Sequence, residues 1–300
     1  MADTSNPTTR VLDILNFLGA HPTETFTLAE IARNVGLSNG SAHRILTTMA
    51  DARFLSRNER HKTYSLGIAM IALGNAAVEK HRGIEIARRE MANLTSELNA
   101  LCTITAIADG ELLMLAREGT PQSHKGLNQI GERQPMVPPV GLCHMAWSGE
   151  KAIAAYIDKA SAYMSEAMRE HLLSAFPLIR QRGFSISAYG STMRKLRQIM
   201  ILPIGQIRDD AYWASVLEVT GQLSANELQL FNINEAIFEG ISYISAPIFS
   251  PEGQVVFELV LNGMPTNLSA QEIEHYIEKL HTTAAIITSE THGRPPKNHS

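Results

Sequence analysis

The chain is poor in cysteine and has no long apolar run. Its 300 residues include two cysteines, Cys102 and Cys143, and no CxxC spacing. Two cysteines are too few for a disulfide framework or a cysteine-rich zinc site, so we expect both to be reduced core residues. No window approaches the roughly 18 apolar residues of a membrane helix, and residues 1–10 lack a hydrophobic signal region. The cytoplasm is therefore the expected compartment.

Motifs for catalysis, metals and nucleotide cofactors are missing as well. The sequence contains neither GxxxxGK[ST] nor a GxGxxG after a strand. Its 11 histidines include no HxxxH pair with a carboxylate partner. His275 and His281 are six positions apart, so on a helix they do not share a face. Cys143 and His144 are adjacent, so on a strand they would face opposite sides, which is poor geometry for a nucleophile and its base. We expect no cofactor, no metal and no catalysis.

The remaining composition is that of a globular protein with one locally basic segment. Hydrophobic residues make up 44%, the net charge is −4 and the isoelectric point is near 6.3. That average excludes a surface that binds nucleic acid everywhere but permits a basic patch. Residues Asn39–Tyr64 hold five Lys/Arg and two Asp/Glu, a local charge of +3. A chain of this length can form one large domain or two unequal ones, and we expect two.

Three short helices are predicted near the N-terminus. The apolar residues of Arg10–Leu18 recur at helical spacing and are followed by glycine and proline. Thr27 and Glu30 have the spacing of a capping box at the start of a second helix. Ser38 is a suitable N-cap for a third helix, whose apolar stripe ends at Met49.

Polar and basic side chains follow the third helix and the segment after it. Phe54–Arg57 and Lys62–Leu66 flank a charged turn, which predicts a β-hairpin with a basic tip. Three helices and a basic hairpin form the order of a winged helix-turn-helix, whose side chains contact phosphates and base edges. The expected DNA-contacting residues are Ser38, Asn39, Gly40, Ser41, His43, Arg44, Thr47, Arg57, Arg60, Lys62 and Thr63. A three-helix unit used only for dimerisation is the alternative.

The N-terminal region resembles the DNA-binding domain of the IclR family of bacterial transcriptional regulators. The resemblance lies in five ordered segments, Arg10–Leu15, Phe26–Ala32, Val35–Ser38, His43–Leu46 and Tyr64–Gly67. It is dense over residues 8–77 and continues more weakly to about residue 290. It implies a winged helix-turn-helix domain at 8–77, a linker helix at 78–99, a GAF-like effector-binding domain at 100–290 and a disordered tail at 291–300.

Periodicity supports the linker and an α+β second domain. Apolar residues recur every three to four positions over Gly83–Asn99, which predicts one helix. Strand-like runs flank Asp109-Gly110, a strong hairpin signal, and a second hairpin is expected from Ile241–Phe249 and Val255–Asn262. With helices expected at 149–157, 166–181 and 269–289, this order predicts an antiparallel sheet.

The resemblance also implies an effector pocket lined by Pro138–Trp147 and by the late strands. The expected effector-binding residues are Gly141, Leu142, Cys143, Asn234, Tyr243, Val260 and Asn262. Many family members have a cysteine at the position of Tyr243, two serines at those of Val260 and Asn262, and an acidic residue near Asn234. The changes remove groups suited to a small oxyacid, so we expect a larger or flatter ligand, an aromatic acid or a lactone-like metabolite. Alternatively, Tyr243 and Val260 only fill the sheet core.

In function, the chain resembles a ligand-responsive transcriptional regulator, more often a repressor, that controls a catabolic operon. The resemblance implies a homodimer or a dimer of dimers (a tetramer) on a double-stranded, pseudo-palindromic operator. Residues Ala188–Gln222 receive no assigned role, and a lid, an insertion at the pocket rim, an oligomer contact and a surface loop remain open.

Two other functions compete with this one. An enzyme that uses the winged helix only to dimerise would need a glycine-rich turn after a strand in its second half, and the sequence has none. A structural DNA-binding protein without a ligand would not explain the large, non-basic second domain.

Overall fold

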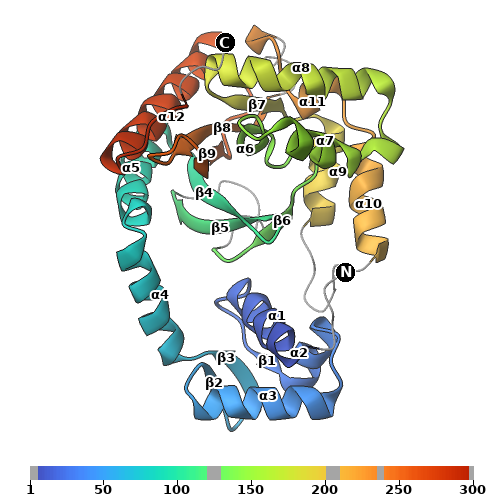
Figure 1. Cartoon of the computed structure of the whole chain (residues 1–300), viewed down its shortest axis with the longest axis vertical. Coiled ribbons are helices and arrows are strands. Elements are labelled where there is room, and N and C mark those ends of the chain that lie inside the picture. The colour runs from blue at the N-terminus through green and yellow to red at the C-terminus, as the bar shows by residue number, and fades with distance from the viewer. Residues whose placement is uncertain (1–5, 120–129, 201–209, 235–239, 297–300) are drawn as a thin grey trace. The chain divides into compact units, whose positions relative to one another are not determined.

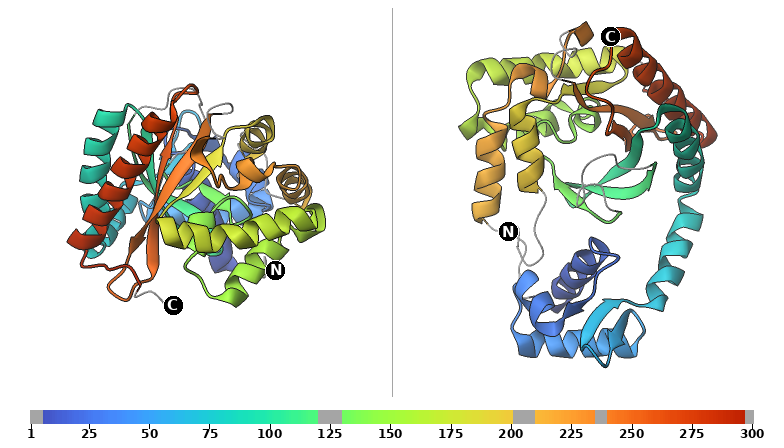
Figure 2. Two further views of the ribbon diagram at one scale, coloured as in Figure 1. Left: turned by 90° about the horizontal axis from the view of Figure 1, so that it is seen from above. Right: turned by 180° about the vertical axis from the view of Figure 1, so that it is seen from behind.

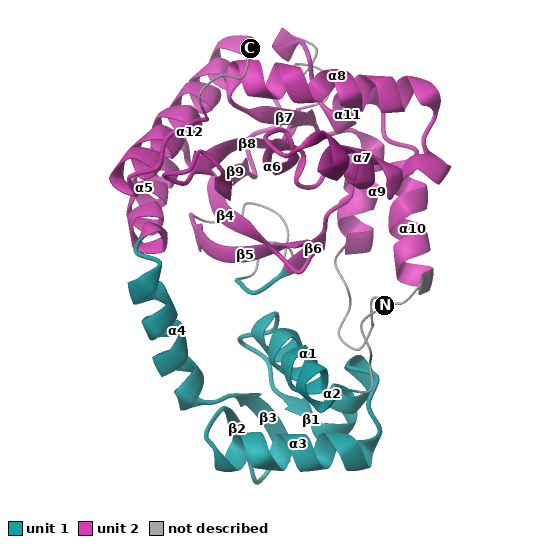
Figure 3. Ribbon diagram, viewed as in Figure 1, with its two compact units in different colours: residues 1–82, 129–132, 202–209 teal, residues 83–128, 133–201, 210–300 magenta. Residues whose placement is uncertain are grey.

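The computed structural model describes residues 6–119, 130–200, 210–234 and 240–296, which divide into two compact units (Figures 1 and 3). The first is built mainly from residues up to Arg82, and the second begins at Gly83. Within the described residues, no helix is both long and apolar enough to cross a membrane.

The first unit consists of three helices and a small sheet. The helices are α1 (Pro7–Gly19), α2 (Leu28–Asn34) and α3 (Asn39–Asp51). The strands β1 (Phe26–Thr27), β2 (Leu55–Asn58) and β3 (Thr63–Leu66) pair antiparallel in the order β1-β3-β2. The two predicted caps are confirmed: Thr27 and Glu30 form a capping box, and the Ser38 hydroxyl accepts the backbone N–H of Ser41.

Helix α1 begins earlier than predicted. The Asn6 side chain accepts the backbone N–H of Thr8, and Pro7 occupies the first helical position, where its missing N–H costs nothing. The inner faces of the helices meet in one apolar core that includes Ile14, Ile31 and Leu46.

The second unit is built on a six-stranded antiparallel sheet in the order β6-β5-β4-β9-β8-β7. The strands are β4 (Leu101–Ala108), β5 (Glu111–Glu118), β6 (Arg133–Pro135), β7 (Ser185–Ala188), β8 (Ile241–Phe249) and β9 (Val255–Asn262). Both predicted hairpins, β4–β5 and β8–β9, are present. They are joined through β4 and β9, so the early and late parts of the domain share one sheet. The predicted α+β class with an antiparallel sheet is confirmed.

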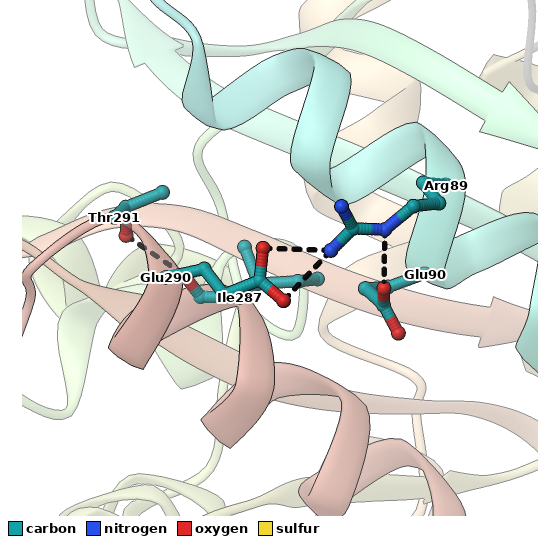
Figure 4. A network of polar contacts seen from close by, with 5 residues as sticks. All are labelled: Arg89, Glu90, Ile287, Glu290 and Thr291. Carbon is teal, nitrogen blue, oxygen red and sulfur yellow. Dashed lines mark hydrogen bonds and ion pairs between the residues drawn. The ribbon is translucent and has the colours of Figure 1, made fainter.

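Helices α5 (Gly83–Leu98) and α12 (Ala270–Glu290) pack together on one face of this sheet (Figure 2, left). Met91 of α5 and Leu280 of α12 are both fully buried in the core cluster that includes the strands. The guanidinium Nη2 of Arg89 lies 2.7 and 2.6 Å from the two carboxylate oxygens of Glu290 (Figure 4). Both side chains of this ion pair are exposed, so the pair stabilises the contact between α5 and α12 less than the burial of Met91 does.

Residues 78–99, which the resemblance assigns to one linker helix, are divided between two helices. Helix α4 (Ile68–Lys80) ends before residues 81–82, and α5 then belongs to the core of the second unit. Periodicity identified the apolar stripe of α5 correctly, but it could not show that the stripe packs on the sheet. The domain boundaries at residues 77 and 99 stay a prediction.

Further helices cover the opposite face of the sheet. They are α6 (Leu142–Met145), α7 (Glu150–Asp158), the 3-10 helix η1 (Ser161–Tyr163), α8 (Glu166–Arg182), α9 (Ser191–Met200), α10 (Asp210–Thr220) and α11 (Ala225–Leu228). Figure 2 (left) shows these helices on the side of the sheet away from α5 and α12.

The prediction of a disordered tail from residue 291 is wrong for residues 291–296. The Gly293 N–H donates to the Thr288 carbonyl at 2.7 Å, and the Arg294 N–H donates to that of Ser250 at 3.1 Å. Arg294 Nε also donates to the Pro251 carbonyl at 2.8 Å. The two bonds from Arg294 attach the segment to the β8–β9 turn, and the bond from Gly293 attaches it to the end of α12. Residues 297–300 lie outside the described residues.

Candidate nucleic-acid interface and ligand pocket

Helix α3 buries one face and exposes a polar one. Ala42 and Leu46 are fully buried in the core of the first unit. The opposite face exposes His43, Arg44 and Thr47. In the first turn of α3 and its cap, Ser38, Asn39 and Gly40 are exposed as well, and Ser41 is half-buried.

Local hydrogen bonds already use some of these hydroxyl groups. The Ser38 hydroxyl donates to the Ser41 hydroxyl at 3.1 Å while it caps the helix. The Thr48 hydroxyl donates to the Arg44 carbonyl at 2.9 Å, so this side chain mainly serves the helix. The Arg44 side chain remains exposed on the outer face.

The hairpin after α3 is the expected wing. Its register pairs Asn58 with Thr63, and the Asn58 side chain accepts the backbone N–H groups of Arg60 and His61 at 3.1 Å each. Lys62 has a left-handed backbone (φ 52°) that closes the turn. The side chains of Arg60 and Lys62 are exposed at the tip, whereas Thr63 is half-buried.

Arg57 of the wing lines a groove that residues of α3 also line. Its guanidinium lies 3.4 Å from the Glu59 carboxylate and 5.8 Å from the centroid of the Tyr64 ring. Arg57 and Thr47 line the same groove, together with Arg53. The wing and the C-terminal half of α3 therefore flank one surface of the first unit.

The second unit contains a cavity of about 90 Å³ between the sheet and α9. A cavity of this size holds several waters or a small organic molecule. The sheet side is lined by Thr103, Thr105, Leu112, Met114, Gln134, Ser242, Tyr243, Glu258, Val260 and Asn262. The other walls are Pro139, Val140, Gly141, Met193, Leu196, Arg197 and Met200.

Four of the seven predicted effector-binding residues line this cavity: Gly141, Tyr243, Val260 and Asn262. The Tyr243 hydroxyl donates to the Pro139 carbonyl at 3.3 Å, which connects β8 with the loop before α6.

The other three predicted residues do not line it. Leu142 and Cys143 are buried in α6, where the Cys143 thiol donates to the Ser245 carbonyl at 3.7 Å and burial raises its pKa. Asn234 is exposed. Adjacent positions on a helix point in different directions, so the lining role of Gly141 does not extend to its two neighbours.

Sequence reasoning missed Glu258, the buried carboxyl group of the cavity. Its exposed fraction is 4%. Burial raises the pKa of Glu258 to about 7, and the nearby Ser245 hydroxyl and His144 backbone amide limit the rise. Among the described residues, no group hydrogen-bonds to its Oε2 atom. The sequence feature that could have revealed it is a single carboxylate within an apolar strand. Glu258 alternates with Val260 and Asn262, so the three side chains share one face of the strand.

Arg197 was missed too, because it lies in residues 188–222, for which no role was predicted. It lines the cavity from α9, and its Nη2 atom donates to Asn262 Oδ1 at 3.1 Å. Of the open roles for residues 188–222, an insertion at the pocket rim fits α9. Residues 201–209 lie outside the described part of the chain.

No group of three or more His, Cys, Asp and Glu in the described residues is arranged to hold a metal ion. Burial lowers the pKa of His144 to about 4, so its imidazole is neutral at physiological pH.

Known proteins that are similar to this chain are transcriptional regulators. Residues 7–59 match the model of the IclR helix-turn-helix domain. The HTH-type transcriptional regulator KdgR of Escherichia coli (strain K12) is 21% identical over 296 residues, which cover 96% of this chain and 93% of KdgR. An IclR transcriptional regulator from Alicyclobacillus acidocaldarius superposes with a TM-score of 0.66 at 17% identity, covering 95% and 98% of the two chains.

A second solved structure is that of an IclR homologue from Microbacterium hydrocarbonoxydans in complex with 4-hydroxybenzoate. It superposes with a TM-score of 0.64 at 18% identity and covers 95% of this chain and 99% of its own. These structures share the fold of both units. Residues 7–59 thus match the IclR helix-turn-helix domain, and over nearly its whole length this chain is similar to DNA-binding transcriptional regulators of the IclR family.

Proposed function

We propose that α3 and the wing bind an operator and that the cavity of the second unit binds a small organic effector. The observation that carries the DNA-binding half is the exposed polar face of α3 beside the basic wing. In this proposal Arg44 contacts a base edge in the major groove, whereas Arg60 and Lys62 contact phosphates. Operator binding requires access to chromosomal DNA, which places the protein in the cytoplasm.

Helix α4 supports self-association. None of its residues is buried, although Ile68, Ile71 and Leu73 have exposed fractions of 74%, 62% and 53%. Large apolar side chains gathered on one exposed helix are typical of an interface. We infer that α4 contacts a second copy, giving a homodimer or a pair of such dimers that places two copies of α3 in successive major grooves.

The mixed lining of the cavity supports a small organic ligand, and the 4-hydroxybenzoate complex of the Microbacterium homologue favours an aromatic acid. The ligand acts by binding more tightly to one relative setting of the two DNA-binding domains in the dimer. In this proposal the protein is a repressor of a catabolic operon, and it performs no catalytic step.

The test uses the full chain and a duplex that it selects from a random DNA pool. Affinity is measured by fluorescence anisotropy with and without 4-hydroxybenzoate. The proposal expects selection of a pseudo-palindromic sequence and a ligand-induced loss of affinity. The Val260→Trp variant, which fills the cavity, should bind DNA without responding to the ligand. No enrichment of any sequence, or an equal response in Val260→Trp, would contradict it.

A further inference from the structure

The polar groups of the cavity in the second unit form two separate poles. At the first pole, Thr105 of β4 and Glu258 of β9 are direct partners in the antiparallel register and have exposed fractions of 7% and 4%. Both line the cavity. Thr105 Oγ1 and Glu258 Oε2 are buried without a hydrogen-bond partner within the described residues.

When Glu258 is ionised, its Oε2 atom lacks a hydrogen-bond donor among the described residues. An ionised carboxylate has only acceptor atoms, and no cation in the described part of the chain forms an ion pair with Glu258. Buried polar atoms in folded proteins are nearly always bonded. Because the unbonded atoms belong to residues that line the cavity, a ligand in the cavity can supply the missing donor.

The second pole lies at the C-terminal end of β9, whereas Glu258 is near the middle of the strand. Asn262 is four residues beyond Glu258, which corresponds to about 13 Å along the strand. Arg197 donates to Asn262 there and presents a guanidinium, which suits a carboxylate through paired N–H donors. Between the poles, Val260 of β9 and Met193 and Leu196 of α9 supply apolar lining. Thr103 of β4, the register partner of Val260, also lines this part of the cavity.

We propose that the effector is a bipolar molecule, with an anionic group at the Arg197–Asn262 pole and a hydroxyl or amino group at the Thr105–Glu258 pole. This rests on the proposed function of the cavity as the effector site. The reverse orientation would bring two anions together at Glu258. An acid without a donor would cover Glu258 Oε2 and leave it unbonded.

Calorimetric titration of the full chain at pH 8 tests the inference with four probes: 4-hydroxybenzoate, benzoate, 4-methoxybenzoate and phenol. We expect 4-hydroxybenzoate to bind at least tenfold more tightly than each of the others. Benzoate and 4-methoxybenzoate lack the donor, and phenol lacks the anion.

Two variants test which group of the ligand binds at each pole. Glu258→Gln should reduce the preference for 4-hydroxybenzoate over 4-methoxybenzoate to within about threefold, because the amide can also donate. Arg197→Met should weaken the acids at least tenfold and leave phenol unchanged. Glu252→Gln, the same change at an exposed position on the β8–β9 turn, is the matched control and should behave as wild type.

The outcomes separate this inference from the proposal on which it rests. Val260→Trp and, independently, Met193→Trp block the cavity, and thermal unfolding and DNA binding verify that each variant folds. If benzoate binds as tightly as 4-hydroxybenzoate and both variants abolish binding, the bipolar ligand is wrong and the effector site stands. If no probe binds, or if binding survives in both folded variants, the inference and the effector site are both overturned.

Discussion

Thr105 and Glu258 are register partners on β4 and β9, and each contributes a buried, unbonded oxygen to the same cavity. The pairing brings together a threonine from the first hairpin of the domain and a glutamate from the last. Because burial raises the pKa of Glu258 to about 7, the charge of the cavity changes near neutral pH.

The raised pKa of Glu258 predicts a pH-dependent stability. The folded pKa is about 7 and the ordinary value is 4.5. Between these values the native chain retains a proton that the unfolded chain has lost, so the free energy of unfolding falls as the pH rises. In Glu258→Gln this contribution is absent. From pH 5 to pH 8, urea unfolding should show wild type losing up to about 3 kcal/mol relative to the variant.

Cys143, Tyr156 and Tyr243 also face this carboxyl group, but burial raises the pKa of each, so they stay neutral across the range. Parallel stability profiles for wild type and Glu258→Gln would show that Glu258 is ionised throughout, contrary to the account.

The buried stripe of α5 predicts unequal costs of two neighbouring substitutions. Met91 is fully buried, so Met91→Ala should lower the free energy of unfolding by about 2–5 kcal/mol. Arg89 forms an exposed ion pair with Glu290, so Arg89→Ala should cost at most about 1 kcal/mol. Urea unfolding measures both. Equal, small effects would mean that α5 is a free linker.

The exposed apolar side chains of α4 predict that the chain forms a dimer and that a charged residue introduced on α4 disrupts it. Ile71→Glu should lower the mass measured by sedimentation equilibrium from that of the assembly toward that of one chain, since a carboxylate opposes burial at the interface. Leu173→Glu on α8, at an exposed leucine of the second unit, is the control and should keep the mass. An assembly that Ile71→Glu leaves intact would exclude α4 as the contact.

The wing predicts a contact with phosphates that does not depend on sequence. Lys62→Ala should weaken binding to all duplexes about equally and reduce the magnitude of the salt dependence by about one unit of slope. Anisotropy titrations at several salt concentrations measure this. Lys151→Ala, an exposed lysine on α7, serves as control. If Lys62→Ala matched Lys151→Ala, the tip of the wing would not contact DNA.

Local sequence signals predicted local structure well. The capping box at Thr27, the N-cap at Ser38 and the turn at Asp109-Gly110 involve residues within a few positions of one another, and each is present. The resemblance to a known family correctly predicted four of the residues that line the cavity.

Features that depend on distant partners could not be predicted. The pairing of Thr105 with Glu258 follows from the order of the strands, which no local pattern encodes. Arg197 belongs to a helix whose inner face is recognised only when the sheet opposite it is known. Arg294 in the tail donates hydrogen bonds to carbonyl groups of the β8–β9 turn. The polar composition of the tail does not indicate these distant partners.

The central claim is that the outer face of α3 contacts bases, and the specificity ratio tests it most directly. This ratio compares the affinity of the full chain for its selected duplex with that for a scrambled duplex of the same composition. The account predicts a ratio of about 1,000 or more for wild type. It predicts a fall of about 5- to 150-fold in Arg44→Ala, with little change on scrambled DNA. A wild-type ratio near one, or a ratio unchanged by Arg44→Ala, would contradict it.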